Sequence, residues 1–166
     1  MKKVRETDEK WMKEAFEESL KAFEEGEVPI GAVVIRDNVV IGRGHNRVES
    51  LNDPTAHAEI IAISAACNTM KNWRLNGCTL YVTVEPCLMC GGAVIHSRID
   101  RIVYGIKEPK FGSFGSVTDI FAKNKFNHEV VVEESSFLAK ETMNLMKKFF
   151  ESKRERDGQK QKIKSV

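Results

Sequence analysis

Pro86-Cys87-Leu88-Met89-Cys90 places two thiols three residues apart, and His57-Ala58-Glu59 supplies an imidazole and a carboxylate earlier in the chain. Side chains three residues apart at the start of a helix point the same way, so both sulfurs would face one ligand. Pro86 suits the residue before such a helix, because it needs no backbone N–H partner there. Zinc binds thiolates, and a helix N-terminus lowers the pKa of a thiol. The stretch therefore predicts a pair of metal ligands where a helix begins.

His57 and Glu59 would complete a catalytic site around these cysteines. Catalytic zinc is typically tetrahedral, with three protein ligands and an open position, and we predict neutral His57 as the third ligand. Glu59 follows two residues later and cannot share the direction of His57 on a helix, so we predict that it lies beside the metal-bound water. Zinc lowers the pKa of that water toward ~7, and a carboxylate can carry its proton to a substrate. The expected cofactor is one zinc ion per subunit.

The cysteine pair could also belong to a redox site or to a structural zinc site. A redox pair usually stands alone near a βαβ unit, and it would leave His57 and Glu59 unexplained. A structural zinc site needs a fourth cysteine or histidine. The chain offers Cys67, Cys78, His45, His96 and His128 for that position. A structural site therefore stays open as an alternative.

Length and composition favour one globular domain, and we expect it over residues 1–156, followed by a basic tail over residues 157–166. The first eight residues are too charged for a signal peptide, and no apolar run is long enough to span a membrane. We therefore expect a cytoplasmic protein with reduced cysteines and no membrane partner. Residues 151–166 carry a net charge of +3 and the remainder carries −1. That distribution suits a polyanion partner, and it is equally typical of a solvated helix end.

Hydrophobic periodicity predicts helices alternating with strands after an opening hairpin. The helices are expected over residues 8–25, with Asp8 as N-cap, 58–68, 88–97 and 137–156. The strands are expected over residues 28–35, starting after Pro29, and over 39–41, 79–84, 102–106 and 130–132. Residues 42–54 and 107–116 are expected as loops. This order indicates an α/β fold with helices on both faces of a mixed sheet.

Four further features of the sequence suggest specific roles. Asn46 lies in a polar loop, where an asparagine usually serves the turn itself. Glu85 is expected to make local hydrogen bonds, and Gly91 and Gly92 suit a close approach of another backbone or of the substrate. Phe149-Phe150 belongs mostly to an apolar packing stripe, although one of the two rings could be exposed and stack on a base.

Several stretches of the chain resemble the bacterial tRNA-specific adenosine deaminases of the cytidine/deoxycytidylate deaminase superfamily. They are Glu27-Val28-Pro29-Ile30-Gly31-Ala32-Val33, Gly44-His45-Asn46-Arg47, Asp53-Pro54-Thr55-Ala56-His57-Ala58-Glu59-Ile60 and Glu85-Pro86-Cys87-Leu88-Met89-Cys90. Ile95-His96-Ser97-Arg98-Ile99 and Phe149-Phe150 continue the likeness, which weakens only in the last dozen residues. The resemblance implies a three-layer α/β/α sandwich with a five-stranded mixed sheet, of the cytidine deaminase type. It also implies a homodimer whose active site is completed across the interface.

The same resemblance implies hydrolytic deamination of adenosine to inosine at the wobble position (34) of a tRNA anticodon, with Glu59 moving the protons. It assigns the base pocket to Val28, Asn46 and the Ala58 backbone. It assigns contacts with the tRNA anticodon loop to Glu108, Lys110, Asn127, Phe149, Phe150 and Arg154. Relatives often carry an aspartate where this chain has Glu108.

Two alternative functions remain from the sequence. A small-molecule deaminase acting on guanine, cytosine or a nucleoside would use the same zinc core. A non-catalytic, zinc-stabilised RNA-binding module is a second alternative, and Glu59 argues against it. The basic tail and the Phe149-Phe150 pair favour RNA.

Overall fold

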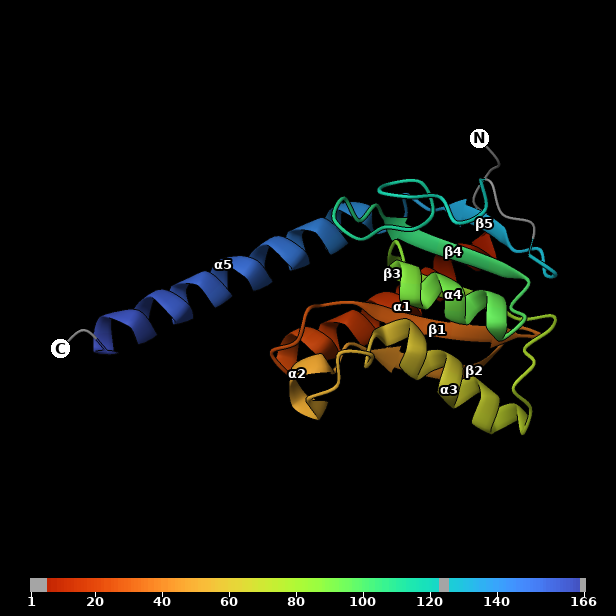
Figure 1. The fold of residues 1–166 in the computed structure, drawn as a ribbon, viewed down its shortest axis with the longest axis horizontal. Helices are drawn as coiled ribbons and strands as arrows, with labels where there is room; N and C mark the ends of the chain where they lie inside the picture. Colours follow the sequence, from red (N-terminus) through yellow and green to blue (C-terminus); the bar gives the residue numbers. More distant parts are fainter. Residues whose placement is uncertain (1–5, 123–125, 165–166) are drawn as a thin grey trace.

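The computed structural model describes residues 6–122 and 126–164, which form a five-stranded mixed sheet between layers of helices (Figure 1). The strands lie in the order β2-β1-β3-β4-β5. Their bounds are β1 Gly31–Arg36, β2 Val39–His45, β3 Thr79–Val84, β4 Arg101–Ile106 and β5 Val131–Glu134. β1 pairs antiparallel with β2 and β3, whereas β3, β4 and β5 run parallel. The predicted α/β sandwich with a five-stranded mixed sheet is confirmed.

In these described ranges, five helices accompany the sheet (Figure 1). They are α1 Glu6–Glu24, α2 Val48–Leu51, α3 Ala58–Met70, α4 Leu88–His96 and α5 Ala139–Lys164. Helix α1 covers one face, and α3 and α4 cover the other. No helix in the described part of the chain is long and apolar enough to cross a bilayer.

The two faces of the sheet carry separate apolar cores because successive strand residues point in opposite directions. In β3, Leu80 and Val82 pack toward α3 and α4, while Tyr81 packs toward Trp11 and Met12 of α1. Both faces are therefore buried, as is typical of a central strand. The residues predicted for this strand, 79–84, match the structure.

The prediction that Asp8 caps the first helix is wrong. Helix α1 begins two residues earlier, at Glu6, and Asp8 is buried inside it. Its carboxylate accepts hydrogen bonds from the Tyr81 hydroxyl at 2.6 Å and from the Arg101 guanidinium at 2.8 Å and 2.9 Å. Arg101 also pairs with Glu133 of β5. Asp8 thus ties α1 to three strands through partners that local sequence does not reveal.

The expected loop over residues 42–54 is also wrong in part. Strand β2 continues to His45, and residues 48–51 form α2. Strand β1 starts at Gly31, after Pro29 as predicted, and Ile30 N donates to Val28 O in a tight turn around Pro29. At the other end of the chain, α5 passes residue 156 without a break and reaches Lys164.

Gly42 and Gly44 explain why β2 extends through residues that look like a polar loop in the sequence. A Cβ atom at Gly42 would overlap the Ala62 carbonyl oxygen, and one at Gly44 would overlap the carbonyl oxygen of Ala58. The backbone of α3 therefore lies directly on the backbone of β2, with no side chain between them. This contact fixes the height of α3 above the sheet, and with it the position of His57.

Gly44→Ala is expected to lower the free energy of unfolding by about 1–3 kcal/mol, because the new methyl group must push α3 away from β2. Urea denaturation would measure the change. Gly92→Ala is the matched control, since a Cβ at Gly92 meets no described atom within 4 Å. Equal stability of the two variants would contradict the close packing of β2 on α3.

Candidate metal centre and active site

Two helices begin at one edge of the sheet and supply the candidate metal ligands. His57 is the N-cap residue of α3 and Cys87 is the N-cap residue of α4, each with an extended backbone. Neither side chain caps its own helix. Cys90 lies one turn into α4 and is buried. The three side chains are therefore free to converge in front of two helix N-termini.

The separations of the three donor atoms suit one tetrahedral metal ion. The His57 Nδ1 atom lies 3.7 Å from the Cys87 Sγ atom and 3.6 Å from the Cys90 Sγ atom. All three donor atoms lie within 4.8 Å of one another. Bonds of about 2.05 Å to nitrogen and 2.3 Å to sulfur, at tetrahedral angles, place such atoms about 3.6 Å apart. The donor set and its spacing therefore fit zinc.

The protonation of the two thiols also suits a cation. A hydrogen bond from Cys90 lowers the pKa of Cys87 to about 4, against the opposing effect of burial, and His57 assists. The same hydrogen bond, together with burial, raises the pKa of Cys90. The hydrogen bond to Cys87 raises the pKa of His57. Cysteine binds a divalent cation as thiolate, so the lowered pKa of Cys87 suits a metal ligand.

Glu59 lies in the first turn of α3 and is 3% exposed. Its Oε2 atom has no hydrogen-bond partner among the described residues, which is costly for a buried oxygen. Burial is the main cause that raises its pKa, to about 7. A buried carboxyl group with one unpartnered oxygen and a pKa near neutrality, next to His57, has the properties of a general acid/base.

Asn46 and Ala58 are joined by the structure. The Ala58 N–H donates to Asn46 Oδ1 at 2.9 Å, and the Asn46 N–H donates to Ile30 O at 3.1 Å. Asn46 is buried and links the end of β2 to the first turn of α3. Its Nδ2 group has no partner in the described part of the chain, so its two N–H bonds remain for a ligand. Val28, half-buried, precedes Ile30 at the same edge.

Glu108 and Lys110 lie on the loop that follows β4, at the edge where α4 begins. Gly112 of this loop forms an isolated antiparallel bridge with Cys87. The Lys110 N–H donates to Glu108 Oε1 at 2.9 Å, and the Lys110 side chain is exposed. The structure thus brings both residues to the neighbourhood of the cysteines.

The rings of Phe149 and Phe150 have different environments on α5. Phe149 is 3% exposed and Phe150 is 42% exposed, with an edge-to-face contact between the rings at 5.2 Å. Only Phe150 can meet a base without rearrangement. Arg154 is exposed one turn further on, and Lys153 lies 3.5 Å from Glu49 of α2. This part of α5 therefore passes the edge that carries the metal ligands.

Asn127 is not brought to the metal centre. Its Oδ1 atom accepts a hydrogen bond from Arg98 at 2.8 Å, just beyond the C-terminal end of α4. The cysteines are at the opposite end of that helix. Within one chain, Asn127 and the candidate ligands are therefore separated by the length of α4.

Glu27 is a buried acid that the sequence did not single out. Its carboxylate accepts hydrogen bonds from Glu49 N at 3.1 Å and Ser50 N at 2.7 Å, the first residues of α2 after Val48. It therefore holds α2 beside Asn46. A charged residue directly before the apolar run Val28-Pro29-Ile30 was the only local signal of this role.

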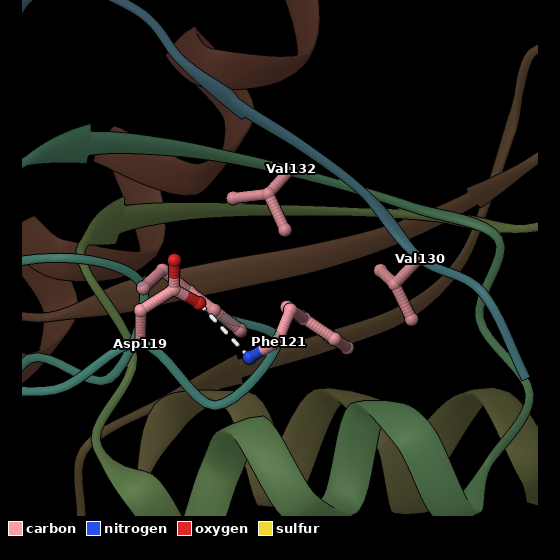
Figure 2. A pocket seen from close by; sticks show the side chains of 5 residues that line it. Asp119, Phe121, Val130 and Val132 are labelled. Carbon is pink, nitrogen blue, oxygen red and sulfur yellow. Dashed lines mark hydrogen bonds between the residues drawn. The ribbon is translucent and has the colours of Figure 1, made fainter. Parts of the chain in front are cut away.

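A separate pocket of about 230 Å³ lies between β5 and the segment after the loop (Figure 2). Its lining residues are Phe114, Asp119, Phe121, Val130 and Val132. Asp119 Oδ1 accepts the Phe121 N–H at 2.9 Å, so this carboxylate serves its own turn (Figure 2). None of the candidate metal ligands lines this pocket, and it is not the candidate active site.

Comparisons with known proteins identify the same region of sequence and structure. A family model described as MafB19-like deaminase matches residues 6–154. A tRNA-specific adenosine deaminase of Bacillus subtilis (strain 168) is 44% identical over 149 residues, which cover 90% of this chain and 92% of the relative. A tRNA-specific adenosine deaminase of Aquifex aeolicus (strain VF5) is 41% identical over 146 residues, which cover 88% of this chain and 95% of the relative.

Solved structures agree with these relatives. A structure from studies of A-to-I editing by tRNA:A34 deaminases has a TM-score of 0.78 and 41% identity, covering 82% of this chain and 98% of that one. The structure of a guanine deaminase from Bacillus subtilis has a TM-score of 0.57 and 38% identity, and the match covers 60% of this chain and 64% of that one. The resemblance noted in the sequence is confirmed.

The raised pKa of Glu59 predicts a pH-dependent stability of the metal-free protein. The carboxyl group titrates near 4.5 when unfolded and about 7 when folded, so the penalty for burying its charge appears as pH rises between these values. Glu59→Gln removes that penalty. As pH rises from about 4.5 to about 7, the unfolding free energy of the variant should therefore increase by about 3 kcal/mol relative to that of wild type. Urea denaturation in chelator would measure it, and a pH-independent difference would contradict the burial of a titrating carboxyl group.

Proposed function

Since this chain belongs to the MafB19-like deaminase family, we propose that it converts adenosine to inosine by hydrolysis at the wobble position of a tRNA anticodon. Two findings together carry the proposal. tRNA-specific adenosine deaminases are 44% and 41% identical to this chain over about nine-tenths of its length. The chain also brings a complete set of candidate metal ligands together. The substrate is position 34 of the anticodon loop, where the base is single-stranded and can leave its stack at low cost.

His57, Cys87 and Cys90 are the proposed zinc ligands, with one ion per subunit. The fit of their donor atoms to tetrahedral bond lengths supports this assignment. A zinc ion there supplies a Lewis acid that makes water a nucleophile at neutral pH. The Glu59 Oε2 atom, buried without a hydrogen-bond partner among the described residues, argues for a catalytic site, because a purely structural centre has no use for it.

Glu59 is the proposed proton carrier. Its carboxylate takes a proton from the attacking water and delivers it to N1 of the purine, while the water oxygen bonds to C6. The C6–N6 bond then breaks, and the amino group leaves as ammonia after a second proton transfer. A pKa of about 7 lets the same group accept and release protons at neutral pH.

Val28, Asn46 and the Ala58 backbone are the proposed base pocket. The free Nδ2 group of Asn46 is the donor that supports this proposal most directly. The Ala58 N–H is already bound to Asn46 Oδ1, so its contribution is to orient that amide toward the ligand.

Glu108, Lys110, Phe150 and Arg154 are the proposed contacts with RNA, and their full or partial exposure along one edge supports them. Lysine and arginine contacts with phosphate make binding weaken as salt increases. Phe149 is buried, so we propose that it supports Phe150 and does not touch a base. Asn127 stays a prediction from the resemblance alone.

A homodimer is proposed as the working form. The first residues of α4, Leu88 and Met89, and the nearby loop residues Phe111 and Val117 are exposed by 62%, 37%, 69% and 57%. Apolar side chains gathered in this way usually mark an interface. A single-chain mass at micromolar concentration, measured by sedimentation, would contradict the dimer.

A cytoplasmic location goes with this proposal. All four cysteines, including Cys67 and Cys78, are free thiols in the structure. Unpaired thiols suit a reducing compartment.

Guanine deamination is the second candidate function, because a guanine deaminase shares this fold at 38% identity over three-fifths of the chain. The greater coverage of the tRNA-specific relatives and the exposed, basic stretch of α5 favour RNA. The non-catalytic RNA-binding module is the weakest candidate, since it leaves Glu59 without a purpose.

Zinc-loaded protein should convert adenosine-34 of an anticodon stem-loop to inosine, with release of ammonia. Free adenosine, cytidine, cytosine and guanine serve as parallel substrates, and mass spectrometry resolves the products. Deamination of guanine with the stem-loop untouched would favour the second candidate. Stem-loop binding without any deamination would favour the third.

Glu59→Gln should lower kcat on the stem-loop by at least about 10²-fold, because the proton carrier is lost. Its zinc content should stay at the wild-type level, since Glu59 is not a ligand. Metal analysis and single-turnover rates test both parts. A variant that keeps most of its rate would refute the assigned role.

Cys87→Ala should lose zinc, because two ligands hold the ion too weakly at neutral pH. Cys67→Ala is the matched control, since that thiol is half-buried and bonds only to Trp73 O at 3.7 Å among the described residues. Metal analysis after gel filtration measures both variants. Full zinc occupancy in Cys87→Ala would overturn the ligand set.

A further inference from the structure

Glu85 connects the metal-binding segment to the loop that follows β4. It stands between the last residue of β3 and Pro86-Cys87, and it is 2% exposed. Its carboxylate accepts the N–H groups of Glu108 at 3.1 Å, Phe114 at 2.8 Å and Ser116 at 3.2 Å, and also the Ser116 hydroxyl. A carboxylate has about four acceptor positions, and all of them are used on one loop.

Other hydrogen bonds also shape this loop, among them Gly112 N to Glu108 O at 2.9 Å and Ile120 N to Ser113 O at 3.0 Å. Residues 107–116 contain no helix or strand, although Ser113 N and Oγ both donate to Pro86 O, at 3.0 Å and 2.9 Å. A Cβ atom at Gly112 would lie 2.5 Å from Glu85 Oε2, so the loop backbone passes directly over the carboxylate. Buried hydrogen bonds to a charged acceptor are about twice as strong as neutral ones. The carboxylate is therefore a strong anchor for this loop.

The four hydrogen-bond donors that meet the Glu85 carboxylate all belong to one loop. The carboxylate organises N–H groups around itself, as a bound anion would.

We propose that Glu85 is a positioning residue for RNA: its carboxylate sets the 107–116 loop against Pro86-Cys87, so that the exposed Lys110 stands at a fixed place beside the metal-binding helix. The inference rests on the proposed function and adds a determinant of substrate binding to it. Because Glu85 is two residues from Cys87, the zinc ligand and the RNA-facing rim share one anchor. Glu85 touches neither substrate nor reacting atoms.

Glu85→Gln tests the proposal in the zinc-loaded full chain. Either oxygen of the carboxylate accepts two loop hydrogen bonds, and an amide nitrogen in its place can accept neither, so that at least one backbone N–H of the loop loses its acceptor. We expect KM for the anticodon stem-loop to rise by about tenfold, with a much smaller change in kcat and unchanged zinc content. Glu129→Gln, at an exposed glutamate, is the matched control and should behave as wild type.

Two variants approach the same contact from the loop. Ser116→Ala removes only the hydroxyl donor and should raise KM in the same direction by less. Gly112→Ala places a methyl group against the carboxylate and should reproduce the effect of Glu85→Gln. The Glu85→Gln/Ser116→Ala double variant should be no worse than Glu85→Gln alone, because both changes disrupt one contact.

Hydrogen exchange gives a readout that does not depend on activity. The amides of Glu108, Phe114 and Ser116 should lose protection in Glu85→Gln, while the amides of α3 keep theirs. Unchanged KM and unchanged exchange would overturn the proposal. If Glu85→Gln fails to fold or to hold zinc, Ser116→Ala and Gly112→Ala decide, and wild-type KM in both overturns it.

Failure of the proposed function is recognised separately. It shows as wild-type protein that leaves the stem-loop unmodified, whatever the exchange of the loop amides. If the loop amides lose protection in Glu85→Gln but the protein has no activity on RNA, Glu85 still anchors the loop. It then has no role in binding RNA, and the proposal is overturned.

Discussion

Convergence of two helix N-termini on one point is the constraint on which the site depends. His57 and Cys87 are the N-cap residues of α3 and α4, so whatever fixes these helices also fixes the candidate metal ligands. Helix α3 is set by backbone contact with β2 at Gly42 and Gly44. Helix α4 follows β3, the strand buried on both faces. The ligands thus take their places from the most rigid part of the sandwich, and the helix dipoles favour thiolate at the same point.

Glu27, Glu59 and Glu85 are buried around this point, and they differ in how fully their oxygens are hydrogen-bonded. Glu27 holds the start of α2, and Glu85 holds the loop after β4. Both carboxylates accept several backbone N–H bonds, which offset the cost of burying their charge. Glu59 has an oxygen with no such partner among the described residues, and burial raises its pKa to about 7. The same residue type therefore holds neighbouring backbone in two places and is the proposed proton carrier in the third, and the difference comes from the number of donors that each one meets.

Residues whose roles follow from local spacing can be predicted from the sequence, and residues whose partners lie far along the chain cannot. The cysteine pair, His57 with Glu59, and β3 each carry a short-range pattern, and the sandwich follows from the order of elements. Asp8 looks like a helix N-cap when only its neighbours in the sequence are considered. Its actual partners, Tyr81 and Arg101, are more than seventy residues away. Gly42-Arg43-Gly44 looks like a polar loop in the sequence, although it forms part of a strand. The two glycines are needed there because the backbone of α3 packs directly on them. Glu27 and the unequal burial of Phe149 and Phe150 likewise depend on tertiary packing.

The separation of thirty residues between His57 and Cys87 has a thermodynamic consequence. A metal ion bound to both would cross-link α3 and α4 and close a long loop through β3, a geometry that the unfolded chain does not hold. The ion would then bind the folded chain alone, and free metal concentration would enter the folding equilibrium by mass action. Metal starvation and heat would act on the same equilibrium, and the melting temperature of this protein would report the zinc supply around it.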